Sequence, residues 1–255
     1  MEAGRHSTSD VTKELTVTEL SRPRPLGFWT TLVWVVVAIF AANFLDQFFV
    51  AIWRKAQSGT SLPSKESLTG LHLILSSAFQ AAILATIARI SGVPYREYFG
   101  LALPRARDAL MGAGSIIGLL IIVHGWMFLL KGTISPFVID MYRAAQDAGT
   151  LPLLWIGIVI AAPTVEEITF RGFVFAGWSQ TRVGVSGAIV ASSLVWALTH
   201  GLVGWSYIFG IFCLGLIFGW LRWRSGSTIL TIVLHAMVNL VVMYDCSVIV
   251  NRIAG

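Results

Sequence analysis

Apolar runs long enough to cross a lipid bilayer dominate this sequence and restrict its fold more than any other feature. A spanning helix needs about 20 mainly apolar residues, because each residue rises ~1.5 Å and the hydrocarbon core is ~30 Å thick. Candidate spans occupy residues of about 27–52, 69–91, 109–130, 151–178, 184–200, 202–222 and 227–250. The sequence therefore predicts an all-α fold, a polytopic transmembrane helix bundle of about seven spans with no sheet.

The composition excludes several classes of protein. Of the 255 residues, 56% are apolar and 12% are charged, whereas soluble domains average ~25% charged residues. A soluble chain of this kind would expose large apolar patches and aggregate. This excludes an ordinary cytosolic domain, a disordered protein and a nucleic-acid module. The formal net charge of +5 comes from Arg and Lys at the ends of apolar runs, which suits membrane topology. Cys213 and Cys246 lie inside such runs and form no disulfide framework.

The distribution of polar residues divides the chain into three regions. Residues 1–26 mix both charges and end with Pro23 and Pro25, which indicates a disordered polar tail. Residues 27–149 hold the N-terminal transmembrane helices. Residues 150–255 hold the last four spans, whose short connections and recurring Gly and Ala predict close antiparallel packing as the core of the bundle. Arg and Lys are more frequent on the N-terminal side of the spans, which predicts a plasma-membrane protein with a cytoplasmic N-terminus.

The fourth span carries ionisable side chains, which are costly inside a membrane and are therefore functional candidates. Its sequence AAPTVEEITFRGF contains Glu166, Glu167 and Arg171. Glu167 and Arg171 are four residues apart, so they share a helix face and can pair as a polar clamp between helices. Glu166 lies ~100° around the helix, and a clamp does not account for it. Pro163 is predicted to bend the helix just before this group.

Two later spans add histidines at helical spacing. The fifth span ends with WALTHG, which contains Trp196 and His200, and the seventh contains LHAMVN, with His235 and Asn239. Residues four apart face the same side of a helix. An amide beside an imidazole suits the stabilisation of an oxygen that gains negative charge. A lone histidine in a helix bundle is more often a hydrogen-bonding group between helices, and we keep that interpretation for the remaining histidines, His6, His72 and His124.

In this order on three helices, the motifs EExxxR, WxxxH and HxxxN resemble those of the CPBP family. These intramembrane proteases, also called the Abi family, are related to the CAAX prenyl endopeptidases and to bacteriocin-processing and immunity proteins. The resemblance covers residues of about 150–243 and implies that Arg171 is a structural partner of the carboxylates. The family more often has Phe where this chain has Trp196, and we expect this side chain only to pack.

The resemblance also implies a catalytic role for five side chains. Glu166 is expected to activate the hydrolytic water, with Glu167 as its companion. His200 is expected to hold the same water, and His235 with Asn239 to stabilise the oxyanion. A hydrolytic site requires these groups to converge, although their positions along the helices differ. Counted from the cytoplasmic helix ends, Glu166 lies ~18 Å, His235 ~12 Å and His200 ~24 Å deep, so a tilt or kink of the short fifth helix is needed.

The residue types leave two mechanisms open. Glu166, His200 and His235 can bind zinc and keep a fourth position for water. An HExxH motif is absent, however, and Asn239 is a poor zinc ligand but a good hydrogen-bond donor. We therefore favour a metal-free mechanism without a cofactor, in which Glu166 takes a proton from water.

Three functions compete at this stage. The first is an intramembrane endopeptidase that acts on a membrane-associated protein or peptide, with a prenylated CAAX-type tail as one candidate substrate. The second is a non-catalytic membrane immunity or scaffold protein of the same fold. The third is a small transporter, which we rank last because the chain lacks the paired, Gly/Pro-interrupted halves typical of transporters. The lipid bilayer is the expected environment, and no nucleic acid is expected as a partner.

Overall fold

The computed structural model describes residues 24–56, 64, 66–129, 134–201 and 205–254. These residues form helices and no strand, which confirms the predicted all-α bundle. Six helices or helical runs in this part of the chain are long and apolar enough to cross a membrane, and a seventh apolar helix is shorter. Six of these seven spans consist mainly of one α-helix each. They are α2 (Phe28–Ala56), α3 (Thr69–Ile90), α5 (Ala106–Leu129), α10 (Gly184–Thr199), α11 (Trp205–Ser225) and α12 (Thr228–Ala254).

The fourth span is built from five consecutive pieces with different helical pitch. These are α7 (Leu151–Ile156), the π-helix η2 (Gly157–Ala161), α8 (Ala162–Glu167), the π-helix η3 (Ile168–Val174) and α9 (Phe175–Ser179). Proline lacks a backbone N–H and disturbs the turn that precedes it, and η2 ends just before Pro163. Segments of π-helix are rare and frequently occur at functional sites. Glu166 and Glu167 lie at the end of α8, between the two π-helical segments.

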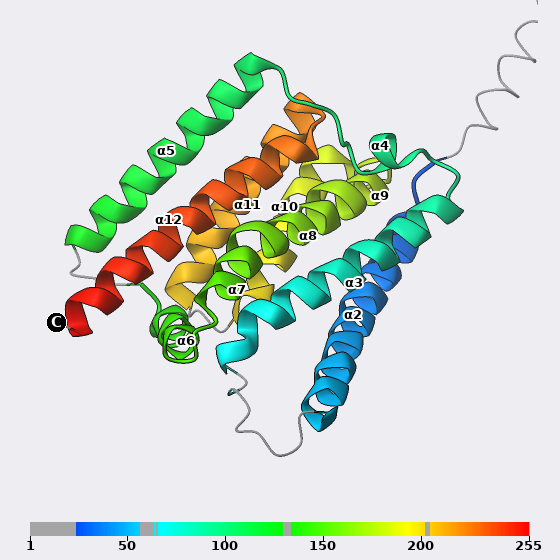
Figure 1. The fold of residues 1–255 in the computed structure, drawn as a ribbon. Coiled ribbons are helices and arrows are strands. Elements are labelled where there is room, and N and C mark those ends of the chain that lie inside the picture. Colours follow the sequence, from blue (N-terminus) through cyan, green and yellow to red (C-terminus); the bar gives the residue numbers. More distant parts are fainter. Residues whose placement is uncertain (1–23, 57–63, 65, 130–133, 202–204, 255) are drawn as a thin grey trace, which may run out of the picture.

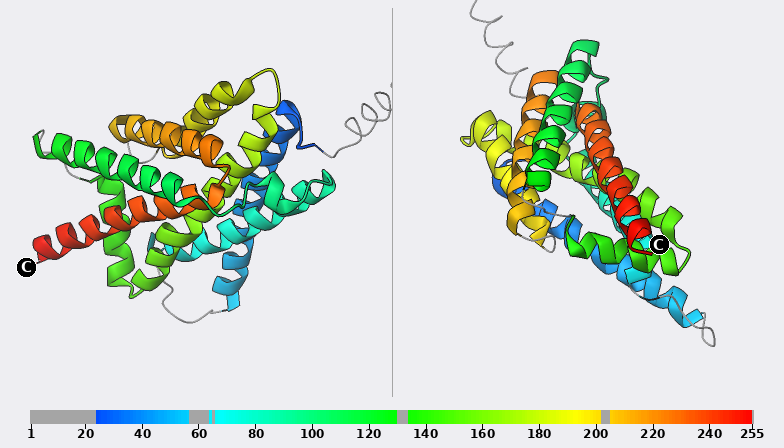
Figure 2. Two further views of the ribbon diagram at one scale, coloured as in Figure 1. Left: turned by 90° about the horizontal axis from the view of Figure 1, so that it is seen from above. Right: turned by 90° about the vertical axis from the view of Figure 1, so that its left-hand side faces the viewer.

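The fourth span runs through the middle of the bundle (Figures 1 and 2). The helices α2 and α3 lie on one side of it and α5 and α12 on the other, with α10 and α11 completing the bundle. The main buried cluster takes side chains from all of these helices, for example Leu84 of α3, Phe173 of η3, Phe218 of α11 and Leu234 of α12. The apolar core is therefore wider than the last four spans that we expected to form it.

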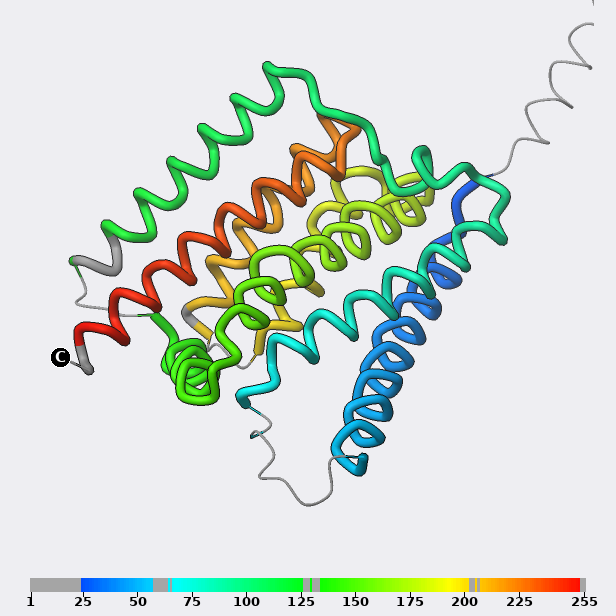
Figure 3. Tube along the Cα trace, in the orientation of Figure 1, coloured from blue at the N-terminus to red at the C-terminus, as the bar shows by residue number. Residues whose placement is uncertain are grey.

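The helix ends alternate between two sides of the bundle, as a polytopic topology requires. In the trace of Figure 3, the start of α2, the end of α3, the start of α5 and the turn between α11 and α12 gather at one side. The predicted tail falls mainly on residues 1–23, which lie outside the described residues. Near the end of this tail, the backbone oxygen of Pro25 accepts a hydrogen bond of 2.8 Å from Gln180, which follows α9. The division of the chain at residue 150 stays a prediction.

The sequence analysis missed two helices, α4 (Tyr95–Tyr98) and α6 (Pro136–Asp147). The helix α6 has only 12 residues, too few to cross a bilayer. Its buried residues include Ile139, Tyr142 and Ala145, which pack with Met243 of α12 and Leu154 of α7. A search for apolar runs overlooks such a helix because only one of its faces is apolar.

Candidate active site

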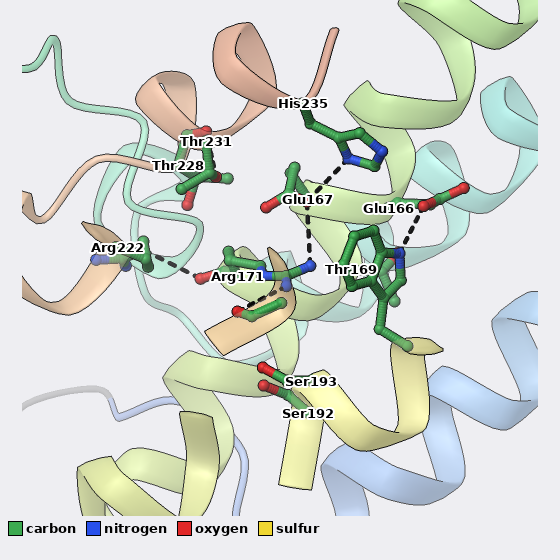
Figure 4. Close-up of polar contacts among 12 residues, drawn as sticks. Glu166, Glu167, Thr169, Arg171, Ser192, Ser193, Arg222, Thr228, Thr231 and His235 are labelled. Atoms are coloured by element: carbon green, nitrogen blue, oxygen red, sulfur yellow. Dashed lines mark hydrogen bonds and ion pairs between the residues drawn. The ribbon is translucent and has the colours of Figure 1, made fainter. Parts of the chain in front are cut away.

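The two adjacent glutamates of α8 have different surroundings, and Glu167 is fully buried. Its Oε1 accepts a hydrogen bond from Arg171 Nη1 at 3.0 Å and lies 3.1 Å from His235 Nδ1 of α12. Arg171 Nη2 also donates to the carbonyl oxygen of Gly215 on α11 at 3.1 Å. The exposed fractions of Glu167, Arg171 and His235 are 0%, 1% and 3%. The predicted pairing of Glu167 with Arg171 is confirmed, and this clamp joins the fourth span to α11 and α12 (Figure 4).

Glu166 points toward α10 instead. Its Oε2 accepts a hydrogen bond of 2.6 Å from the indole Nε1 of Trp196 and lies 3.9 Å from Nε2 of His200. The side chains of Glu166 and His200 are 25% and 27% exposed, whereas that of Glu167 is fully buried. Glu166 is thus the more accessible of the two carboxylates. It faces the imidazole of His200 at a distance too long for a direct hydrogen bond.

The other ring nitrogen of His200 indicates which tautomer the neutral ring adopts. His200 is the C-cap residue of α10, and its Nδ1 lies 3.0 Å from the backbone oxygen of Trp196. A carbonyl oxygen can only accept, so Nδ1 carries the hydrogen and Nε2 of the neutral ring is an acceptor. In the neutral ring, the atom that faces Glu166 is therefore a hydrogen-bond acceptor.

Glu166, His200 and His235 were estimated from the sequence to lie at different depths in the membrane, but the structure brings each histidine close to a glutamate. His200 comes within 3.9 Å of Glu166, and His235 within 3.1 Å of Glu167, although the three helices contribute them at different distances from their ends. The 16-residue helix α10 ends beside the middle of the fourth span, which removes the discrepancy.

The expectation that Trp196 only packs is wrong. Besides donating to Glu166, its ring receives the guanidinium of Arg171, whose Cζ lies 4.4 Å from the ring centroid. Its ring lies edge-on to both imidazoles, with centroid distances of 5.4 Å to His200 and 5.2 Å to His235. The signal in the sequence was the indole N–H itself, which a phenylalanine lacks.

The structure places Asn239 against the backbone of the fourth span. Its Nδ2 donates a hydrogen bond of 2.8 Å to the carbonyl oxygen of Ile158 in η2. The π-helical segment and α12 are thus tied together one turn beyond His235. The amide has a second hydrogen, which this bond leaves available.

The alternative set of zinc ligands is not assembled in the described part of the chain. No group of three or more His, Cys, Asp or Glu side chains there is arranged to hold a metal ion. Glu166 faces His200, whereas His235 directs Nδ1 to the other carboxylate, Glu167. Within the described residues, the three candidate ligands are thus not found as one group.

Two of the three histidines interpreted as non-catalytic, His72 and His124, contact an aspartate on a neighbouring helix. His72 Nδ1 of α3 lies 2.6 Å from Asp46 Oδ2 of α2, and His124 Nε2 of α5 lies 2.9 Å from Asp245 Oδ2 of α12. These contacts fit the interpretation of both residues as hydrogen-bonding groups between helices. His6 lies outside the described residues.

An open apolar groove of about 270 Å³ lies on the fourth span and α12, and its lining includes none of the six predicted site residues. It runs between the fourth span and α12, and its lining includes Thr164, two residues before Glu166, and Ala236, next to His235.

Residues 148–241 match the family model described as Type II CAAX prenyl endopeptidase Rce1-like. The matched segment contains all six predicted site residues, Glu166, Glu167, Arg171, His200, His235 and Asn239. Neither a curated protein nor a solved structure matches the chain. The match confirms the resemblance to the CPBP family and, at the level of the family, supports an intramembrane endopeptidase.

Proposed function

We propose that this protein is an intramembrane endopeptidase that hydrolyses a peptide bond of a membrane-associated protein or peptide. The observation that carries the proposal is the 3.9 Å separation between Glu166 Oε2 and His200 Nε2, on two helices inside the segment that matches the protease family. Both side chains are about one quarter exposed, so substrate and water can reach them.

A water molecule placed between Glu166 and His200 would be well oriented for attack. Hydrogen bonds to water are about 2.8 Å long, so one water can contact both atoms across the 3.9 Å gap. Both groups are acceptors, so each would take one hydrogen of the water and leave an oxygen lone pair free. Glu166 then removes a proton as the oxygen attacks the carbonyl carbon, and returns it to the leaving amine.

His235 and Asn239 are the proposed donors to the oxyanion. His235 directs Nδ1 toward Glu167, and Figure 4 shows its second ring nitrogen turned away from Glu167, toward the side on which Glu166 lies. In the doubly protonated ring both nitrogens donate, and the carboxylate of Glu167 is a counter-ion for that form. Asn239 would donate with the amide hydrogen that does not bind Ile158.

We further propose that the reaction is metal-free and needs no cofactor. The described residues support this, because no three His, Cys, Asp or Glu side chains among them converge as metal ligands. Each proposed step uses only protein groups and water.

A prenylated CAAX-type tail is the substrate class that we propose. The match to a CAAX prenyl endopeptidase family supports it, and the apolar groove beside Thr164 and Ala236 suits a hydrocarbon chain. We also propose that the protein lies in the plasma membrane with a cytoplasmic N-terminus, because Arg and Lys gather on that side of the spans.

The test compares Glu166→Gln and His200→Gln with matched controls in liposomes that contain a farnesylated CAAX peptide. We expect Glu166→Gln to lower kcat about 10²-fold or more, since a positioned general base contributes about 10²–10⁴-fold. The controls are Glu97→Gln on α4, an exposed glutamate, and His124→Gln on α5. Both should retain the activity of the unmodified protein.

Cleavage by the unmodified protein and its loss in the two site variants support the proposal. Full activity in folded, inserted Glu166→Gln and His200→Gln proteins would contradict it. An unmodified protein that cleaves no peptide offered to it would favour the non-catalytic immunity or scaffold function.

A further inference from the structure

We propose that Trp196 is a positioning residue that aims the carboxylate of Glu166 at the hydrolytic water. The inference rests on the proposed function, because it assigns to Trp196 a task in the same reaction. It starts from the 2.6 Å hydrogen bond between the indole Nε1 and Glu166 Oε2. Hydrogen bonds to a charged partner are shorter and stronger than neutral ones, so this contact restricts the rotation of the carboxylate.

The indole ring is itself held firmly. Trp196 is 1% exposed, and its ring contacts that of Phe218 on α11 at a centroid distance of 6.1 Å. Gly215, also on α11, provides the space for it, because a Cβ there would lie 3.1 Å from Cε3 of the ring. Because the indole ring is buried and packed, its N–H points in a fixed direction. A residue that positions a catalytic group must be held in this way.

Trp196 also keeps the two carboxylates in separate roles. The guanidinium of Arg171 lies over the face of the ring at 4.4 Å, while the ring edge donates to Glu166. Arg171 binds Glu167, so Glu166 has the indole N–H as its partner and remains available to water. Without that donor, the side chain of Glu166 is free to rotate away from His200.

A phenylalanine at this position would keep the aromatic face but remove the donor. The chain offers a matched control in Trp178 of α9, which is 4% exposed and donates its Nε1 to the carbonyl oxygen of Phe28 at 3.3 Å. Trp178→Phe removes the same group from an equally buried ring that contacts none of the proposed catalytic residues.

The experiment measures kcat and KM of Trp196→Phe and Trp178→Phe with the farnesylated CAAX peptide. We expect Trp196→Phe to lower kcat about 10-fold or more with KM changed less than about 2-fold, because the lost bond acts on the base rather than on substrate binding. Trp178→Phe should leave both constants unchanged. If Trp196→Phe does not fold, β-(3-benzothienyl)alanine at position 196 keeps the ring shape and replaces the N–H with sulfur.

A folded Trp196 variant with the kcat of the unmodified protein would overturn the inference, as would a change in KM alone. That result leaves the proposed function intact if Glu166→Gln is inactive. Full activity of Glu166→Gln would instead refute the proposed function. The two failures are therefore distinguishable within one set of variants.

Discussion

His235 Nδ1 lies 3.1 Å from Glu167 Oε1, and not beside the neighbouring carboxylate of Glu166. Glu167 thus holds both Arg171 and His235, all three buried, while Glu166 faces the partly exposed His200. Two glutamates that are adjacent in sequence therefore serve different purposes. Glu167, with Arg171, joins three helices in the interior, and Glu166 is the carboxylate that we propose to act on water.

The buried clamp gives a prediction about stability. Arg171→Leu leaves Glu167 as a buried charge without its main partner, so we expect it to lower the free energy of unfolding by about 3–5 kcal/mol. Replacing both Glu167 and Arg171 by Leu should cost less than Arg171→Leu alone, because no unpaired charge remains between them. Unfolding in mixed micelles measures both changes.

The control is an ion pair at the surface. Arg143 and Asp140 of α6 are 3.7 Å apart, with side chains 40% and 73% exposed, and Arg143→Leu should cost less than about 1 kcal/mol. Equal losses for Arg143→Leu and Arg171→Leu would show that the buried clamp contributes no more than an exposed pair.

Asn239 gives a prediction that separates catalysis from structure. Asn239→Ala removes the hydrogen bond to Ile158 O and the amide hydrogen proposed for the oxyanion. We expect kcat to fall about 10²–10³-fold, as for the loss of other oxyanion donors, with the thermal midpoint only slightly lower. A variant that loses thermal stability but keeps its kcat would show that Asn239 only anchors α12 to η2.

Removal of metal ions should not affect the reaction. No three candidate ligands converge in the described residues, so we expect cleavage rates to stay constant in EDTA and in 1,10-phenanthroline. The readout is the initial rate of peptide cleavage after dialysis against each chelator. Activity that is lost and then restored by added Zn²⁺ would contradict the metal-free mechanism.

Much of the fold follows from local properties of the chain. The span positions follow from the ~20 apolar residues that a bilayer requires, and the pairing of Glu167 with Arg171 follows from a four-residue spacing on one helix. Such features need no knowledge of how distant segments pack, and the structure agrees with them.

The bond between Trp196 and Glu166 depends instead on the relative placement of two helices. Spacing along a helix shows that Trp196 and His200 share a face, but not which carboxylate that face meets. The same applies to Asn239, whose contact with Ile158 depends on the π-helical backbone of η2. Depth counted from helix ends failed for His200 because the estimate treats every helix as straight and equally inserted.

The close approach of α3 to the fourth span gives a final prediction. A Cβ on Gly70 would overlap the backbone of Leu153 and Leu154, and one on Gly157 would lie 2.9 Å from the carbonyl oxygen of Gly70. Backbone cannot move aside as a flexible side chain does, so we expect Gly70→Ala to lower the free energy of unfolding by about 3 kcal/mol or more. Gly114→Ala on α5 is the control, since a Cβ there meets nothing within 4 Å, and alanine should stabilise the helix by up to about 1 kcal/mol. Similar unfolding energies for the two alanine variants would show that glycine is not required at this contact.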